Sequence, residues 1–243
     1  MNIARKNAII TGASSGIGRS ISVQLAKNGV NVALIGRSLE GLNETAAMLP
    51  EGSKYICYSG DLRLEEDSIN GVNHVVNQWG SLDYLINCAG VSQRSSYKVE
   101  EIETEDFKKI MDTNLDSLLF CSREAIPHLK KSQDAYIINI LSTAAFSTGA
   151  GGGMYSASKY AARALHESMV ASYKGSNIRV SAVSPGPVHT NIWSHKTEEI
   201  TQKRKDGMLQ PNNIADIVLF LLKLEPNVHI GNITVEPWFY KKS

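Results

Sequence analysis

Two side chains that could exchange protons stand one helical turn apart in this sequence. Tyr155 and Lys159 are four residues apart in a stretch with helical apolar spacing, which places both on one face. A tyrosine with an ordinary pKa near 10 is a poor base at neutral pH, and a nearby ammonium lowers that pKa by favouring the phenolate. Because such a pair is common by chance, its meaning depends on Ser142, at the end of an expected strand, and Asn114, in an expected helix.

A second group of residues forms a glycine-rich turn after the first expected strand. Gly12 permits a sharp strand-to-helix turn, Gly16 lets the backbone approach a diphosphate, and Gly18 allows close helix–strand packing. The free N–H groups and the positive end of the following helix then favour an anion. The turn predicts a dinucleotide site, and a tight turn without a ligand is the alternative.

The residues after the second expected strand bear on which dinucleotide is bound. An acidic residue there would accept hydrogen bonds from a ribose 2′-hydroxyl, whereas Arg37 would pair with a 2′-phosphate. No acid occurs there before Glu40. We therefore expect NADP(H) rather than NAD(H), with Ser14 and Ser38 as further phosphate donors. The alternative is that Arg37 is a solvated loop charge.

The elements that must position these residues alternate between short β-rich runs and longer helical patterns, which is typical of an α/β fold with a parallel sheet. We predict a single doubly wound Rossmann-type domain over residues 1–243, with a seven-stranded parallel sheet and helices on both faces. A polar segment at about 189–209 is expected to be a lid within it. The expected strands are 7–11, 31–36, 54–58, 83–88, 136–142, 179–184 and 230–235, and the expected helices are 17–28, 39–48, 65–79, 104–131, 154–174 and 212–223.

Taken together, these motifs resemble those of the short-chain dehydrogenase/reductase family over essentially the whole chain. Asn87-Cys88-Ala89-Gly90 resembles the family's Asn-Asn-Ala-Gly segment, and the segment from Pro185 to Thr190 resembles its Pro-Gly-x-Val-x-Thr loop. The cofactor contacts that the resemblance and the glycine turn imply are Gly12, Ser14, Ser15, Gly16, Ile17, Gly18, Arg37, Ser38, Asp61, Leu62, Asn87, Ala89, Gly90, Tyr155, Lys159, Pro185, Gly186, Val188 and Thr190.

The resemblance also implies an activity, namely NADP(H)-dependent hydride transfer to or from a small carbonyl or secondary alcohol. Hydride addition to a carbonyl leaves a developing alkoxide that needs a proton, which Tyr155 would supply. By resemblance, Lys159 also binds the nicotinamide ribose, Ser142 orients the carbonyl, and Asn114 holds a water in a proton relay. A dinucleotide-sensing protein without turnover and a purely structural subunit are the alternatives.

Three positions depart from the family pattern. Cys88 replaces the second Asn of the strand-four segment, and Leu141 replaces a Ser often found before the catalytic one. The third departure is the C-terminal part of the chain, which reads Gly231-Asn232-Ile233-Thr234-Val235 instead of ending with Asp-Gly-Gly. This ending resembles members that act on small 3-hydroxy acids, so a 3-hydroxy or 3-oxo acid derivative is one candidate substrate.

Substrate contacts are expected at the cleft rim, from Gln93, Ser142, Phe146, Met154 and Trp193. Lys196 and the run from Lys203 to Lys205 could attract an anionic substrate, but Glu198, Glu199 and Asp206 offset them, which favours a solvated surface. No metal site is expected, since His189 and His195 lack partners at ligand spacing.

The composition sets limits on partners and location. The 243 residues carry 25 Lys and Arg against 24 Asp and Glu, so no general field favours nucleic acid. We expect no membrane association, because no apolar run reaches the length of a membrane span. Three Cys in apolar surroundings indicate reduced thiols, and hence a cytoplasmic protein. By resemblance, the helices at 104–131 and 154–174 pair subunits, giving a homodimer or homotetramer.

Overall fold

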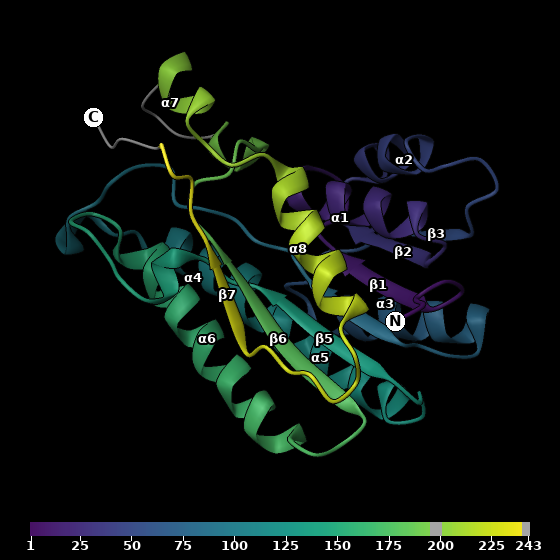
Figure 1. The fold of residues 1–243 in the computed structure, drawn as a ribbon. Coiled ribbons are helices and arrows are strands. Elements are labelled where there is room, and N and C mark those ends of the chain that lie inside the picture. The colour runs from purple at the N-terminus through teal and green to yellow at the C-terminus, as the bar shows by residue number, and fades with distance from the viewer. Residues whose placement is uncertain (195–200, 240–243) are drawn as a thin grey trace.

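The computed structural model describes residues 1–194 and 201–239, and in them seven parallel strands form one sheet in the order β3-β2-β1-β4-β5-β6-β7 (Figure 1). This order confirms the predicted doubly wound, seven-stranded parallel sheet. The strands are β1 (Asn7–Thr11), β2 (Asn31–Gly36), β3 (Tyr55–Ser59), β4 (Tyr84–Asn87), β5 (Ala135–Ile140), β6 (Ile178–Pro185) and β7 (Asn232–Val235).

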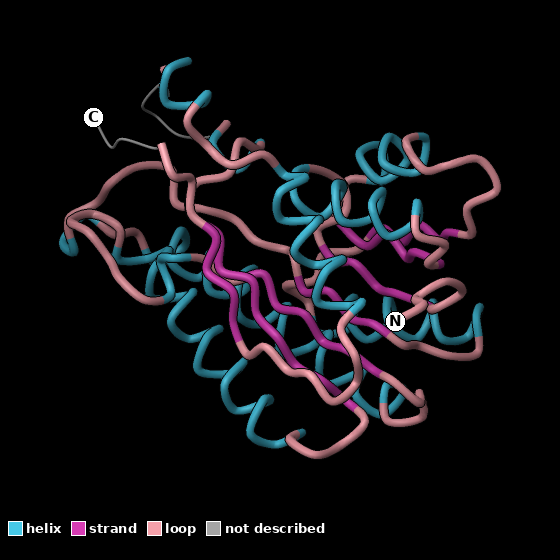
Figure 2. Tube along the Cα trace, viewed as in Figure 1, coloured by secondary structure: helices cyan, strands magenta, loops and turns pink. Residues whose placement is uncertain are grey.

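Helices cover both faces of this sheet (Figure 2). Three helices pack against one face of the sheet and form one hydrophobic core with it: α1 (Gly16–Lys27), α2 (Leu39–Ala47) and α8 (Pro211–Lys223). Three more helices pack against the opposite face and form a second hydrophobic core: α3 (Glu65–Trp79), α5 (Ser117–Leu129) and α6 (Gly153–Tyr173). Successive residues of a strand point to opposite faces, so both faces must be apolar when both are covered.

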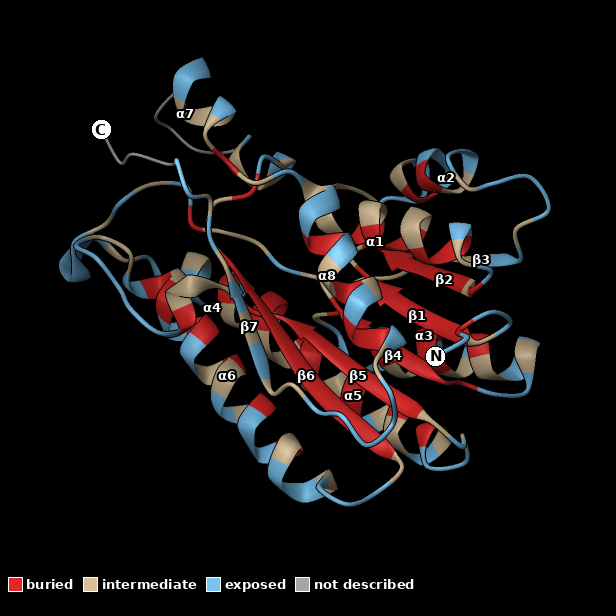
Figure 3. Ribbon diagram, viewed as in Figure 1, coloured by how far each residue is buried: buried red, intermediate tan, exposed pale blue. Residues whose placement is uncertain are grey.

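The central strands are accordingly buried along their whole length. Every residue of β1, β5 and β6 is buried, whereas the edge strands β3 and β7 hold only half-buried and exposed residues. Figure 3 shows the same gradient, with buried residues concentrated in the sheet and exposed ones on the outer surfaces of the helices. The uninterrupted apolar runs in the sequence follow from this double coverage.

The helix expected at 104–131 differs from the prediction. It divides into α4 (Thr104–Met111), a π-helical segment (Asp112–Asp116) and α5. The Thr113 hydroxyl donates to the carbonyl of Lys109, and the Ser117 hydroxyl donates to that of Thr113. A π-helical turn inside an α-helix frequently marks a functional position, and this one contains Asn114.

The described part of the segment expected to form a lid contains two short helical elements. These are a 3₁₀ turn (Asn191–Trp193) and the short helix α7 (Gln202–Asp206), and two more 3₁₀ turns occur at Val99–Glu101 and Thr143–Ala145. The expectations for His195, Lys196, Glu198 and Glu199 lie outside the described residues. Among the described helices, none is both long and apolar enough to cross a lipid bilayer.

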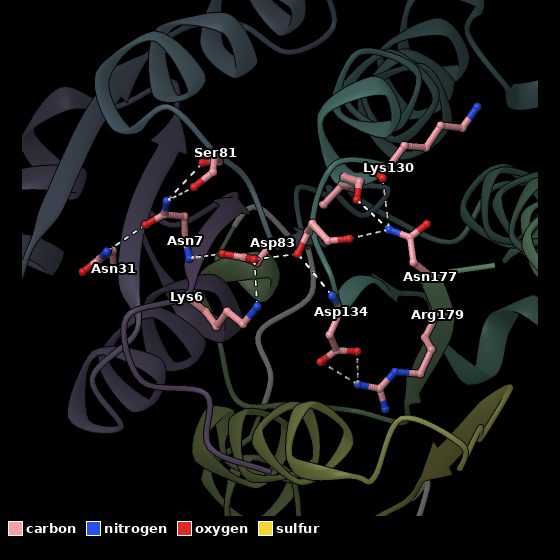
Figure 4. A network of polar contacts seen from close by, with 11 residues as sticks. Lys6, Asn7, Asn31, Ser81, Asp83, Lys130, Asp134, Asn177 and Arg179 are labelled. Carbon is pink, nitrogen blue, oxygen red and sulfur yellow. Dashed lines mark hydrogen bonds and ion pairs between the residues drawn. The ribbon is translucent and has the colours of Figure 1, made fainter.

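A polar network holds the amino ends of the strands together (Figure 4). The Asp83 carboxylate accepts hydrogen bonds from the Lys6 ammonium, the Asn7 backbone N–H and the Ser132 hydroxyl. The Arg179 guanidinium pairs with Asp134 at 2.9 Å nearby. This end of the sheet is therefore closed by hydrogen bonds, and the carboxyl end remains for a cleft.

Candidate functional site

Two connected cavities lie along the carboxyl ends of the strands. The larger, of about 730 Å³, is lined by the glycine turn and by the residues that follow β2, β3 and β4. The smaller, of about 510 Å³, is lined by the residues after β5 and β6 and by the start of α6. Because Cys88, Gly90 and Thr190 line both, the two form one cleft. The carboxyl edge is where doubly wound sheets bind ligands.

The glycine turn has the geometry that a dinucleotide diphosphate requires. Gly12 and Gly16 have φ of +66° and +52°, which other residues rarely adopt. A Cβ on Gly12 would lie 2.9 Å from the Ala89 Cα, and one on Gly18 would lie 2.3 Å from the Gly12 carbonyl oxygen. The Ser15 side chain makes no capping bond to α1, whose first residues line the larger cavity. The N–H groups and the positive dipole end of α1 are thus available to an anion. The turn therefore fits the diphosphate of a dinucleotide.

The far end of the larger cavity is rich in arginine. Arg37 and Ser38 line it, and the Ser38 hydroxyl caps α2 by accepting from the Gly41 N–H at 3.1 Å. Arg63 also lines it and pairs with Asp61 through its Nε, at 2.9 Å from each carboxylate oxygen. This hydrogen-bonded guanidinium lowers the pKa of Asp61. Arg63 is not among the contacts that the motifs predict, although its place two residues after Asp61 could have indicated it.

The four candidate catalytic residues come together in and around the smaller cavity. Ser142 follows β5, and its hydroxyl accepts a hydrogen bond from the Ala144 N–H at 3.1 Å. The Tyr155 hydroxyl hydrogen-bonds with Ser142. Lys159 is buried, with its ammonium 5.9 Å from the Tyr155 ring centroid and 3.2 Å from the Ile140 carbonyl oxygen to which it donates. Proximity of a hydroxyl pair and an ammonium is the arrangement that general acid–base chemistry needs.

Burial dominates the electrostatics of this group. Burial raises the pKa of Tyr155, while the hydrogen bond with Ser142 lowers it. Burial also lowers the pKa of Lys159 to about 8. Burial is the main cause of both pKa shifts, so the expectation that Lys159 lowers the pKa of the phenol stays a prediction.

Asn114 lies buried behind this group. Its amide oxygen accepts from the Val91 N–H at 2.8 Å, and its amide nitrogen donates to the Val91 carbonyl at 3.0 Å and to the Ser158 hydroxyl at 2.9 Å. Ser158 in turn donates to the Tyr155 carbonyl at 2.7 Å. The π-helical segment therefore ties the loop after β4 to the helix that carries Tyr155.

The loop after β6 borders the smaller cavity, as the resemblance implied. Pro185, Gly186, Val188 and Thr190 all line it. Trp193 also lines it and donates from its indole to the Val188 carbonyl at 2.7 Å. The Thr190 side chain lies against the glycine turn, where it would contact a Cβ on Gly16 at 3.2 Å. This loop therefore joins the two cavities.

Three residues expected at the site point elsewhere. The Asn87 amide donates to Ser122 and Asn139, both at 2.9 Å, so its side chain bonds within the fold and does not line the cleft. Phe146 stacks on the Arg163 guanidinium at 4.2 Å, and Met154 is only 2% exposed in the protein interior. Neither lines the smaller cavity, which corrects the expectation that they contact substrate.

Cys57, Cys88 and Cys121 are free thiols, as predicted, and burial raises the pKa of Cys88 to about 12. Within residues 1–194 and 201–239, no group of three or more His, Cys, Asp or Glu side chains is placed to hold a metal ion.

A doubly wound sheet with this diphosphate turn and this hydroxyl–ammonium group belongs to the class of NAD(P)-dependent oxidoreductases. The family model described as short chain dehydrogenase matches residues 6–201. The chain therefore belongs to the short-chain dehydrogenase/reductase family, as the motifs predicted.

Comparison with individual proteins agrees with this assignment. An uncharacterized oxidoreductase of Staphylococcus epidermidis is 29% identical over 97% of this chain and 98% of its own. An alcohol dehydrogenase from the archaeon Thermococcus sibiricus, solved in complex with 5-hydroxy-NADP, has a TM-score of 0.88 at 26% identity over 98% and 99% of the two chains. A 3-ketoacyl-(acyl-carrier-protein) reductase from Brucella melitensis, solved with NADH, shares the fold with a TM-score of 0.87 at 24% identity over 97% and 98%.

Proposed function

We propose that this protein is an NADP(H)-dependent oxidoreductase that interconverts a small carbonyl compound and the corresponding secondary alcohol. The observation that carries the proposal is the convergence of Ser142, Tyr155 and Lys159 on a cavity continuous with a cleft that fits a dinucleotide. The bound cofactor supplies or accepts the hydride. Side chains of this protein orient the substrate and transfer the proton.

In the reducing direction, the Ser142 hydroxyl donates a hydrogen bond to the substrate carbonyl and orients it. As the carbonyl carbon gains hydride, the Tyr155 hydroxyl transfers its proton to the carbonyl oxygen, and the alcohol forms. The resulting phenolate is stabilised by Lys159, one helical turn away, and regains a proton from solvent. Oxidation follows the same steps in reverse, with Tyr155 as the base.

Two arginines support the preference for NADP(H). Arg37 directly follows β2, where a 2′-phosphate lies in folds of this kind, and Arg63 lines the same cavity. Arg37 is also near enough to Asp61 to lower the pKa of that carboxyl. The Thermococcus sibiricus enzyme carries an NADP analogue. The Brucella melitensis enzyme carries NADH, so the choice between dinucleotides has to be measured on this chain.

Further cofactor contacts follow from the family motifs. Asp61 and Leu62 would border the adenine, and Ala89 and Gly90 the ribose, because these residues line the larger cavity. Val188 and Thr190 would hold the nicotinamide carboxamide and so select which face presents its hydride. The segment at 189–209 would close over a bound substrate, and Trp193 would contact it.

The test is turnover with purified protein. We expect NADPH oxidation with at least some members of a panel of ketones, aldehydes and 3-oxo acids, and NADP reduction with some 3-hydroxy acids. Tyr155→Phe should lower kcat by about a thousandfold or more while the Kd for NADPH stays within about twofold, since only the proton donor is lost. Substantial turnover by Tyr155→Phe would contradict the proposed role.

The competing function is a dinucleotide-sensing protein without turnover. It predicts tight NADPH binding and no carbonyl-dependent oxidation by the wild-type chain. The intact set of Asn114, Ser142, Tyr155 and Lys159 argues against it, because a sensor has no need of an acid–base group beside its ligand.

A further inference from the structure

The first turn of α6 carries Tyr155, yet it begins with glycines. The N-cap is Gly152, which has no side chain to accept a hydrogen bond, and the first helical residues are Gly153, Met154 and Tyr155. The N–H groups of these residues have no partner within the helix. A helix start without a capping side chain is poorly defined, and here it holds the candidate proton donor.

The missing cap comes from another segment of the chain. Gln93, in the loop after β4, accepts a hydrogen bond through its amide oxygen from the backbone N–H of Tyr155 at 3.1 Å. The chain separation of the two residues is 62 positions, so this is a tertiary contact and not part of the helix. It satisfies one orphan donor at the residue that the reaction needs in place.

The side-chain amide of Gln93 is itself buried and hydrogen-bonded at every polar atom. It is 5% exposed, and its amide nitrogen donates to the carbonyl oxygens of Ser95 at 2.7 Å and Gly151 at 2.5 Å. The Gly151 carbonyl also accepts from the Tyr97 N–H at 3.2 Å. Both donors and the acceptor of the amide are therefore bonded to backbone groups, and the rotamer of Gln93 is fixed.

Gly151 explains why the contact can be so close. It has a φ of +73°, and a Cβ there would lie 2.6 Å from the Ser96 Cβ. Only glycine lets the segment before α6 approach the loop after β4 at this distance. The glycine-rich stretch before Tyr155 thus allows Gln93 to contact the first turn of α6.

We propose that Gln93 is a positioning residue that sets the place of the Tyr155 hydroxyl by holding the backbone of Tyr155. The proposal rests on the proposed function. Proton transfer needs heavy atoms within about 2.6–3.2 Å, so a small shift of the helix start moves the phenol out of reach. Gln93 lines the cleft, but its amide is committed to the backbone, so it acts through Tyr155 and not on substrate.

The test compares Gln93→Met, which keeps the length of the side chain without its hydrogen bonds, with wild type. We expect kcat to fall by about tenfold or more, equally for carbonyl substrates of different size and charge, with KM and the Kd for NADPH within about twofold. Hydrogen–deuterium exchange at the Tyr155 amide should speed up about tenfold or more, while the last turns of α6 keep their protection.

A second variant tests the same contact from its other side. Gly151→Ala forces apart the segments that Gln93 joins, so it should reproduce the fall in kcat, and the double variant should be little worse than either single one. Gly153→Ala is the matched control, since a Cβ there meets nothing within 4 Å, and its kcat should stay within about twofold of wild type.

Other outcomes overturn the proposal. A selective rise in KM for some substrates would make Gln93 a direct substrate contact, and an unchanged kcat in Gln93→Met would remove the positioning role. A wild-type chain without turnover would instead contradict the proposed function, and the role of Gln93 in catalysis with it. Unchanged exchange at the Tyr155 amide would refute the cap whether or not the chain turns over.

Discussion

Lys159, which we propose stabilises the Tyr155 phenolate, is held in the fold at a cost in stability. It is 5% exposed, and burial lowers its pKa from 10.5 to about 8. Below pH 8 the ammonium is charged in both the folded and unfolded states, so the fold bears the full desolvation cost, about 3 kcal/mol. Between pH 8 and 10.5 the unfolded chain binds the proton more strongly, so stability from this group rises with pH.

We therefore expect Lys159→Met to raise the free energy of unfolding at pH 7 by about 1–3 kcal/mol while abolishing turnover. The gain should shrink as the pH rises from 8 to 10.5, because the wild-type lysine then loses its charge in the folded state. Urea denaturation at several pH values measures this. Lys174→Met, at the exposed end of the same helix, is the control. Equal stability of Lys159→Met and wild type at pH 7 would refute the burial cost.

Arg37 decides, in our proposal, between two cofactors. Arg37→Asp replaces a partner of the 2′-phosphate with a carboxylate that repels it and can accept from a 2′-hydroxyl. We expect the ratio of NADPH to NADH affinity to fall by about a hundredfold, as measured by the fluorescence of each bound cofactor. Lys27→Asp makes the same charge change at the end of α1 and should leave the ratio unaltered. An unaltered ratio in Arg37→Asp would make Arg37 a solvated charge.

At the scale of elements, the two ends of the sheet differ in structure. The carboxyl end stays open as a cleft, and the amino end is closed by the polar network of Figure 4. Within it, Arg179 donates to both oxygens of Asp134 at 2.9 and 3.2 Å and stacks on the Tyr136 ring at 4.4 Å. The side chains of this ion pair are only 8% and 13% exposed. Removing one partner leaves a buried charge without its counterion.

Asp134→Ala should therefore lower the free energy of unfolding by about 3–5 kcal/mol. The double variant Asp134→Ala with Arg179→Met removes the orphaned charge and should recover part of that loss. Urea denaturation gives both values, and kcat of the folded variants should stay near that of wild type because the pair lies at the opposite end of the sheet. A double variant less stable than Asp134→Ala would contradict this account.

At the scale of the whole molecule, a bound dinucleotide would join elements from both halves of the sheet. The cleft takes residues from the ends of β1, β2, β3, β4, β5 and β6, so a ligand that fills it opposes unfolding of the whole fold. The assembly of the chain into a homodimer or homotetramer stays a prediction, which light scattering of the purified protein would test.

We expect NADPH at a hundred times its Kd to stabilise the protein by about 2.7 kcal/mol, which raises the Tm by about 5–10 °C. NADH at the same concentration should give a smaller rise, because it lacks the phosphate that Arg37 would bind. Differential scanning fluorimetry measures both. No rise with either dinucleotide would favour a purely structural subunit.

Much of this protein could be predicted from sequence because the signals are local. Apolar runs in β1 and β2 predicted strands covered on both faces. The glycines of the first turn, between an expected strand and an expected helix, predicted a diphosphate site. The four-residue spacing of Tyr155 and Lys159 placed both on one helix face, since that face depends only on helix geometry. The other expected site residues were predicted from the family motifs.

What the tertiary structure decided is where side chains point once segments distant in sequence meet. Asn87, Phe146 and Met154 stand near the right motifs, but packing turns Asn87 to Ser122, Phe146 to Arg163 and Met154 into the interior. The hydrogen bond that the Tyr155 N–H donates to Gln93 and the π-helical segment at Asn114 are equally invisible in a linear pattern. Their energies come from contacts between loops, and no periodicity of the chain encodes which loops will touch.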